Sequence, residues 1–173
     1  MSLSACGNSS DVSNETINLS STTSPKQTIE IAFEALKNAN SREFNQFIQY
    51  NERQDGIFIY KDNKLFGNNL DGEGKKLIES VFANLSYEIE EVNENEDSAT
   101  VKIKITNRDL SNVYEDILRY KDSDNPLIEA IKNANGKMVT TDLKITLNKT
   151  GGIWKIEMDA HLMDALCGGL GVK

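Results

Sequence analysis

The candidate for catalysis with the most suggestive spacing is a group of three side chains near the end of the chain. His161, Asp164 and Cys167 stand at i, i+3 and i+6, and a thiol, an imidazole and a carboxylate can act as a nucleophile, its base and the group that orients the base. If this segment is a helix with Leu162 and Leu166 on its buried side, His161 and Cys167 lie about 120° apart around the axis and about two turns apart along it. The two are then beyond hydrogen-bonding reach, so we expect Cys167 to be a small buried side chain and His161 to pair with a neighbouring aspartate.

Motifs that would specify another chemistry are absent from the sequence. The patterns GxGxxG, GxxxxGK[ST], GxSxG and HExxH do not occur, which leaves no basis for a nucleotide loop, a serine hydrolase elbow or a zinc protease helix. The two cysteines, Cys6 and Cys167, form no CxxC pair, and His161 is the single histidine, so we expect neither a metal site nor a cofactor. Residues 69–74 resemble a calcium loop only in composition, and we expect a turn there.

Composition and charge narrow the class of partner. The chain has 173 residues, 38% of them hydrophobic, and no apolar run approaches the length of a membrane span. Its 27 acidic and 19 basic residues give a net charge of −8 that is spread along the sequence. This balance opposes binding to a nucleic acid or to anionic lipid through a basic face, so we expect no nucleic-acid partner.

The sequence divides into a polar tether, residues 1–24, and a folded domain, residues 25–173. In GNSSDVSNETINLSSTTS, residues 7–24, twelve of eighteen residues are Ser, Thr or Asn, and such a segment buries too little apolar surface to offset the entropy lost on ordering. The domain begins at a clear helix signal, with Ser24 as the N-cap, Pro25 in the first turn and Gln27 completing a capping box.

The helices expected in the domain follow from apolar stripes and from capping residues. The first carries one apolar face, and a second short helix begins at Ser41. A third spans about residues 74–85, a fourth is capped by Asp109, and a fifth opens at Asn125 and stops by Gly136. A short strand at residues 57–60 is an ambiguous reading. The first stripe consists of Ile29, Ala32, Phe33 and Leu36, the second of Phe44, Phe47 and Ile48, and the fourth of Leu110, Val113, Tyr114 and Ile117.

Strand alternation predicts four strands in two hairpins, one on either side of residues 93–97 and one from about residue 138 to 158. Helices followed by such hairpins indicate an α+β domain with an antiparallel sheet. The side chains predicted to face the core are Tyr87 and Ile89; Val101, Ile103 and Ile105; Leu143, Ile145 and Leu147; and Trp154, Ile156 and Met158. No carboxylate is among them, because Asp142 and Glu157 have the opposite parity.

The run ALKNANSREF and the closing run GGIWKIEMDAHLMDALCGGL resemble the opening and the final strand and tail of the nuclear transport factor 2-like superfamily, in the form found as small secreted lipoproteins of Gram-positive bacteria. The resemblance covers Pro25 to Lys173 in outline. It implies a single domain with a strongly curved, cone-like antiparallel sheet of about four main strands wrapped around N-terminal helices. The helical insertion at residues 109–133 departs from that pattern and puts the strand order in doubt.

The same resemblance implies a role for Cys6. Leu3-Ser4-Ala5-Cys6 looks like a lipobox, in which the cysteine is freed by cleavage and lipidated through its sulfur, and the polar tether follows it directly. Only five residues precede Cys6, so we expect a basic and apolar export segment to be encoded upstream of Ser4. The alternative is an accidental cysteine on a polar tail. The lipoprotein reading places the protein outside the cell, anchored to the outer face of the cell membrane.

Enzymes of this superfamily use Asp, His or Tyr side chains that project into the cone. The apolar rows predicted here favour instead a non-catalytic binding or interaction module, with a small apolar ligand or an envelope protein as its partner. The alternative is a small acid/base enzyme, isomerase or dehydratase-like, that uses Tyr hydroxyls with Asp159 or His161 at the mouth of the cone. The side chains predicted to line a pocket are Phe33, Tyr50, Tyr60, Tyr87, Tyr114 and Trp154.

Overall fold

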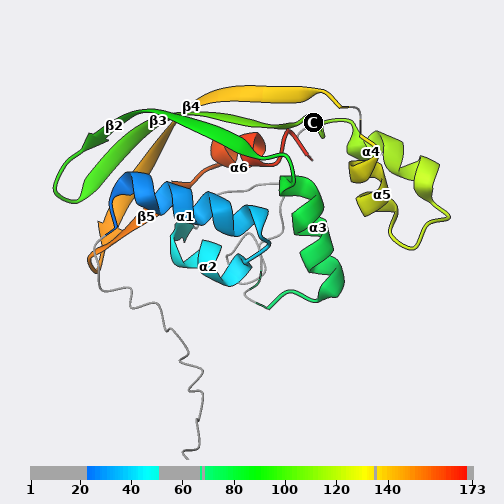
Figure 1. Ribbon diagram of the computed structural model, residues 1–173, viewed down its shortest axis with the longest axis horizontal. Helices are drawn as coiled ribbons and strands as arrows, with labels where there is room; N and C mark the ends of the chain where they lie inside the picture. Colours follow the sequence, from blue (N-terminus) through cyan, green and yellow to red (C-terminus); the bar gives the residue numbers. More distant parts are fainter. Residues whose placement is uncertain (1–22, 51–66, 68, 135, 171–173) are drawn as a thin grey trace, which may run out of the picture.

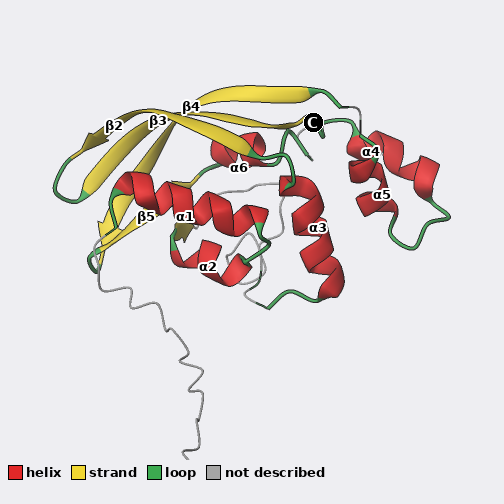
Figure 2. Cartoon of the chain, in the orientation of Figure 1, coloured by secondary structure: helices red, strands yellow, loops and turns green. Residues whose placement is uncertain are grey.

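The computed structural model describes residues 23–50, 67, 69–134 and 136–170. Helices lie on one face of a five-stranded sheet, and the insertion α4–η1–α5 lies beyond one end of it (Figures 1 and 2). The helices are α1 (Pro25–Lys37), α2 (Ser41–Gln46), α3 (Gly72–Phe82), α4 (Val113–Asp116), the 3-10 helix η1 (Ile117–Tyr120), α5 (Pro126–Lys132) and α6 (Ala160–Leu166). The strands are β1 (Ile48–Tyr50), β2 (Ser86–Glu94), β3 (Ser98–Arg108), β4 (Met138–Thr150) and β5 (Ile153–Met158).

The sheet has the order β1-β5-β4-β3-β2. The predicted hairpins β2–β3 and β4–β5 are confirmed, and β3 and β4 join them in one antiparallel ladder from the pair Ser98–Asn148 to the pair Arg108–Met138. A bulge between Ile89 and Glu91 interrupts the pairing of β2, which is one edge of the sheet. This arrangement is the predicted α+β architecture.

The fifth strand was not predicted. Ile48, expected on the face of the second helix, instead opens β1, which pairs in parallel with β5 through Ile48–Ile156, Gln49–Glu157 and Tyr50–Met158. The helix α2 ends at Gln46 because the Phe47 carbonyl accepts a hydrogen bond from the Ile156 amide of β5. The predicted strand at residues 57–60 lies outside the described residues.

The start of α1 agrees with its sequence signal. The Ser24 hydroxyl accepts a hydrogen bond from the Gln27 amide, and the Gln27 side chain accepts one from the Ser24 amide, which completes the capping box. The predicted stripe of α1 is buried against the sheet, with Phe33 fully inaccessible to solvent. Helix α1 therefore fills the space beneath the sheet.

The predicted cap at Asp109 is wrong. The carboxylate of Asp109 accepts hydrogen bonds from the Ser111 amide and hydroxyl, and α4 begins only after Asn112, whose side chain makes no capping hydrogen bond. Two long-range hydrogen bonds fix the backbone at this point. The Asp109 amide donates to the Lys137 carbonyl, and the Leu110 amide donates to the Gly168 carbonyl. The expected fourth helix therefore begins later, as α4, and the 3-10 helix η1 follows it directly.

Two consecutive side chains at the end of β3 bind the C-terminal ends of three helices. Asn107 is fully buried, and its Nδ2 donates to the carbonyl of Val81 in α3 at 3.0 Å and to that of Leu166 in α6 at 2.7 Å. Nη1 of Arg108 donates to the Ile131 carbonyl at 2.9 Å and to the Lys132 carbonyl at 3.3 Å, both in α5. The last carbonyls of a helix lack intrahelical partners, so these donors satisfy groups that the helices cannot satisfy alone.

Replacing Asn107 by Ala should lower the free energy of unfolding by about 2–3 kcal/mol, because two buried carbonyls lose a donor. The change is measured as the midpoint of urea unfolding. The exposed Asn93, whose Nδ2 donates to Glu91, provides the control, and Asn93→Ala should change the same quantity by less than about 0.5 kcal/mol. Equal effects of the two substitutions would contradict the role assigned to Asn107.

Gly168 and Gly152 provide a matched pair of substitutions. Both have positive φ angles, 60° and 81°, but a Cβ at Gly168 would overlap the Arg108 carbonyl oxygen, whereas a Cβ at Gly152 meets nothing within 4 Å. Gly152→Ala should therefore cost about 1 kcal/mol, from backbone strain alone. Gly168→Ala should cost about 2–4 kcal/mol, because strain and overlap add. Thermal unfolding of the two variants tests this order.

Candidate functional site

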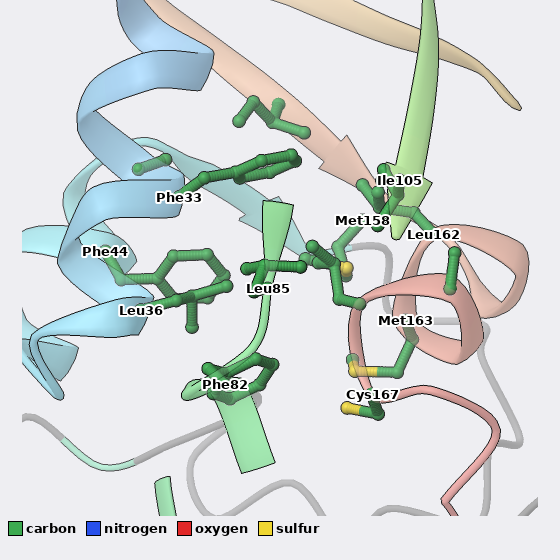
Figure 3. Close-up of a cluster of buried hydrophobic side chains, with 14 of the residues drawn as sticks. Phe33, Leu36, Phe44, Phe82, Leu85, Ile105, Met158, Leu162, Met163 and Cys167 are labelled. Carbon is green, nitrogen blue, oxygen red and sulfur yellow. The ribbon is translucent and has the colours of Figure 1, made fainter. Parts of the chain in front are cut away.

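The helix-facing side of the sheet was the predicted place for a pocket, and it is packed. The phase assigned to the strands is confirmed, since the predicted inward side chains of β3 and β5 are buried, as are Ile145 and Leu147 of β4. Tyr87, Ile89 and Leu143 are partly buried against the same core, whereas Asp142 is exposed. In Figure 3 the labelled side chains of α1, α2, α3, β3, β5 and α6 lie together in one cluster: Phe33, Leu36, Phe44, Phe82, Ile105, Met158, Leu162, Met163 and Cys167, with Leu85 after α3.

Two of the predicted pocket-lining residues meet within this packing. The rings of Phe33 and Tyr87 stack edge to face, with centroids 5.1 Å apart and planes at 89°. Trp154 is 1% exposed, and the Lys149 ammonium lies 5.3 Å from the centroid of its ring. Phe33 and Trp154 thus belong to the hydrophobic core.

The remaining predicted lining residues are spread over the molecule. Tyr50 is partly buried at the end of β1, and its hydroxyl donates to the Asn45 side chain at 2.8 Å. Tyr114 is 52% exposed on α4, in the insertion beyond the end of the sheet. Tyr60 lies outside the described residues. Tyr50 packs against the same core cluster as Tyr87, whereas Tyr114 is exposed away from it.

Tyr87 has the environment of a packing residue. Burial raises the pKa of its hydroxyl above the ordinary value of 10.0, and the nearby Glu30 and Glu34 carboxylates raise it further. Desolvation and negative charge both disfavour the phenolate. The hydroxyl accordingly keeps its proton throughout the physiological range and is poorly suited to act as a base.

The cysteine of the candidate triad is buried at the end of α6. Cys167 is 2% exposed, and burial, with a smaller contribution from Asp164, raises the pKa of its thiol from 9.0 to about 12. His161 is exposed near the start of the same helix. Asp159 is the N-cap of this helix, and its Oδ1 accepts a hydrogen bond from the Leu162 amide at 2.7 Å. The exposed imidazole and the buried thiol thus lie at opposite ends of α6, in agreement with the separation expected from helical geometry, and a thiol that keeps its proton is a poor nucleophile.

The described part of the chain contains no cluster of three or more His, Cys, Asp or Glu side chains that could hold a metal ion. It also contains no helix with the length and apolar character needed to cross a bilayer.

Three hollows open on the outside of the described fold, and none of them is lined by a predicted pocket residue. The first has a volume of about 360 Å³ and is lined by Glu30, Ile31, Glu34, Ala35, Asn38 and Glu43. The second, of about 640 Å³, is lined by Asn38, Ala39, Asn40, Ser41, Arg42, Asn69, Leu70 and Lys75. The third, of about 410 Å³, is lined by Lys76, Glu79, Ser80, Ala83, Arg108 and Lys132.

The third hollow, called the basic hollow below, is a feature that sequence reasoning missed. Its three cationic side chains come from α3, from the end of β3 and from the end of α5, so no segment of the sequence carries them together. One of the three cations could have been recognised in the sequence. Lys132 stands in the last turn of the predicted fifth helix, where a cation interacts favourably with the negative end of the helix dipole.

Comparison with known proteins gives one structural similarity to report. No family model matches the sequence, and no curated protein matches it. Among solved structures, TsrD from Streptomyces laurentii is similar, with 15% sequence identity, a TM-score of 0.43, and an alignment that covers 84% of this chain and 95% of that one. The nuclear transport factor 2-like family stays a prediction from the sequence.

The burial of Cys167 can be tested in a Cys6→Ser variant, in which it is the remaining thiol. The folded protein should not react with Ellman's reagent at pH 8, and one thiol should react after denaturant is added. The free energy of unfolding should fall as the pH rises above 9, because the unfolded thiol ionises near 9.0 and the folded thiol only near 12.

In a Cys6→Ser/Cys167→Ala variant, the free energy of unfolding should fall less above pH 9 than in the Cys6→Ser variant. The difference between the two variants isolates the contribution of the thiol from that of the Lys and Tyr side chains that titrate in the same range. Stoichiometric labelling of the folded Cys6→Ser protein at pH 8 would contradict the burial.

Proposed function

We propose that the protein is a non-catalytic binding module that works outside the cell, held to the outer face of the cell membrane by a lipid on Cys6. The anchor is supported by the lipobox-like Leu3-Ser4-Ala5-Cys6 and by the polar segment that follows it. In this proposal residues 7–24 connect the anchor to the domain, which begins at Pro25.

The observation that carries the binding role is the packing between the sheet and its helices. The concave side that would hold a substrate in a nuclear transport factor 2-like enzyme is occupied by side chains such as Phe33 and Trp154, which are 0% and 1% exposed. Interiors packed in this way have no room for a ligand without repacking. The partner is therefore recognised on the outside of the domain, which favours an envelope component over a small apolar ligand taken into the core.

Acid/base catalysis has less support from the same residues. A general acid or base acts within hydrogen-bonding reach of a substrate, usually in a site that shifts its pKa. The exposed His161 and the N-cap Asp159 flank the beginning of α6, and neither lines any of the three hollows described above.

The anchor is tested by expressing the gene with its natural upstream codons in the native host and separating membranes from medium. The wild-type protein should fractionate with membranes and carry a diacylglyceryl mass on its N-terminal peptide, and Cys6→Ser should lose both. Retention of the Cys6→Ser protein in the membrane fraction would overturn lipid anchoring at Cys6.

Binding and catalysis are separated by complementing a deletion strain with the double variant Asp159→Asn/His161→Ala. Asn preserves the capping oxygen while removing the carboxylate, so the fold should be retained. A binding module should complement fully, whereas an enzyme that uses these groups should lose about 100-fold or more of its activity. Failure of a correctly folded double variant would favour the acid/base alternative.

A further inference from the structure

We propose that the basic hollow binds a phosphate group carried by a small hydroxyl-bearing molecule. The hollow is lined by residues of α3, of α5 and of the end of β3, and it gathers three cationic side chains, those of Lys76, Arg108 and Lys132, around about 410 Å³ of space. The inference rests on the proposed function in one respect, which is that the ligand is bound and not turned over.

The charge of the hollow is opposite to that of the chain. Three cations and one carboxylate, Glu79, line it, whereas the whole chain has a net charge of −8. Lys76 forms no ion pair with a described residue, and Lys132 pairs only loosely with Glu129, at 3.8 Å between largely exposed side chains. The three cations outnumber the Glu79 carboxylate in the hollow, and an oxyanion bound between them would relieve their mutual repulsion.

Arg108 is held in place before any ligand arrives. Its Nη1 donates to the two carbonyls at the end of α5, and its Nε and Nη2 form no hydrogen bond with a described residue. A planar guanidinium fixed through one nitrogen can present its remaining donors to two oxygens of a phosphate at once. Lys76 and Lys132 add two further positive charges to the lining of the same hollow.

The two polar groups that accompany the cations indicate what carries the phosphate. The Ser80 hydroxyl donates its hydrogen to the Lys76 carbonyl at 2.7 Å, so its oxygen remains an acceptor. The Glu79 carboxylate is also an acceptor. Inorganic phosphate near neutral pH can donate only through its own P–OH groups, which then no longer serve as charged acceptors for the cations, whereas a phosphorylated polyol or sugar presents separate hydroxyl donors beside a phosphate whose free oxygens all remain acceptors.

The probe for this site is glycerol 3-phosphate, with glycerol as its uncharged match. In a titration followed by amide NMR on the full chain at low salt, glycerol 3-phosphate should shift the amides of Lys76, Ser80, Arg108 and Lys132 in a saturable way, and glycerol should not. Absence of saturable shifts at these residues would overturn the site.

Charge variants make the test specific and leave the Arg108 contacts with α5 intact. Lys76→Gln and Lys132→Gln should each weaken binding about threefold to fivefold, and Glu79→Gln should strengthen it by a similar factor, as expected for single exposed charges. Lys26→Gln, on α1, provides the control, because Lys26 pairs with Glu30 and is not part of the hollow. Equal weakening by Lys26→Gln would overturn the proposal in favour of nonspecific attraction.

The phosphate can come from a free metabolite or from a lipid headgroup. Vesicles of phosphatidylglycerol that displace glycerol 3-phosphate, where phosphatidylcholine vesicles do not, would support the headgroup. Binding of glycerol 3-phosphate without displacement would support the soluble ester. Loss of the site in these experiments leaves the complementation result unaffected, so the two proposals fail separately.

Discussion

The structure depends on hydrogen bonds that the last two side chains of strand β3 donate to carbonyl groups at the C-terminal ends of three helices. The Asn107 amide joins the ends of α3 and α6, and the Arg108 guanidinium joins the end of α5, so three helices that are distant in sequence are fixed to one point of β3. Gly168 completes the junction by allowing α6 to turn against the Arg108 backbone. A helix C-terminus is the negative end of its dipole, so a cationic donor such as Arg108 suits this place.

Local patterns predicted the elements of the domain better than their connections. The capping box at Ser24, the phase of the four main strands and the opening of α5 at Asn125 all depend on residues within a few positions of each other. The strand β1 could not be predicted in this way, because its three residues become a strand only by pairing with β5, more than 100 positions away. The start of the expected helix after Asp109 was misplaced for a similar reason, since the Asp109 and Leu110 amides donate to the carbonyls of Lys137 and Gly168, which are distant in the sequence.

The candidate sites illustrate the same distinction. Helical geometry alone was enough to separate His161 from Cys167, and the buried thiol, with a pKa near 12, agrees with it. The net charge of −8 correctly describes the average surface, but it conceals the basic hollow, whose cations meet only when α3 and α5 are brought to the end of β3. A filled core and an empty pocket have the same alternating pattern in the strands that form them, so the sequence could not distinguish the two for aromatic residues such as Phe33 and Trp154, which are buried.

The edge strand β2 would matter for contacts between copies of the protein, if the proposed lipid anchor holds them on one membrane. An unpaired edge offers its amides and carbonyls to a strand of another molecule, and tethering many copies to one membrane would raise the rate of such encounters. In β2 the glutamates at positions 88, 90, 91 and 94 and the bulge beside Ile89 place negative charge and an interrupted register along that edge. Glu90 and Glu91 form ion pairs with Lys104 and Lys102 of β3. The bulge, together with the charges of Glu88 and Glu94, would oppose the pairing of two identical edges.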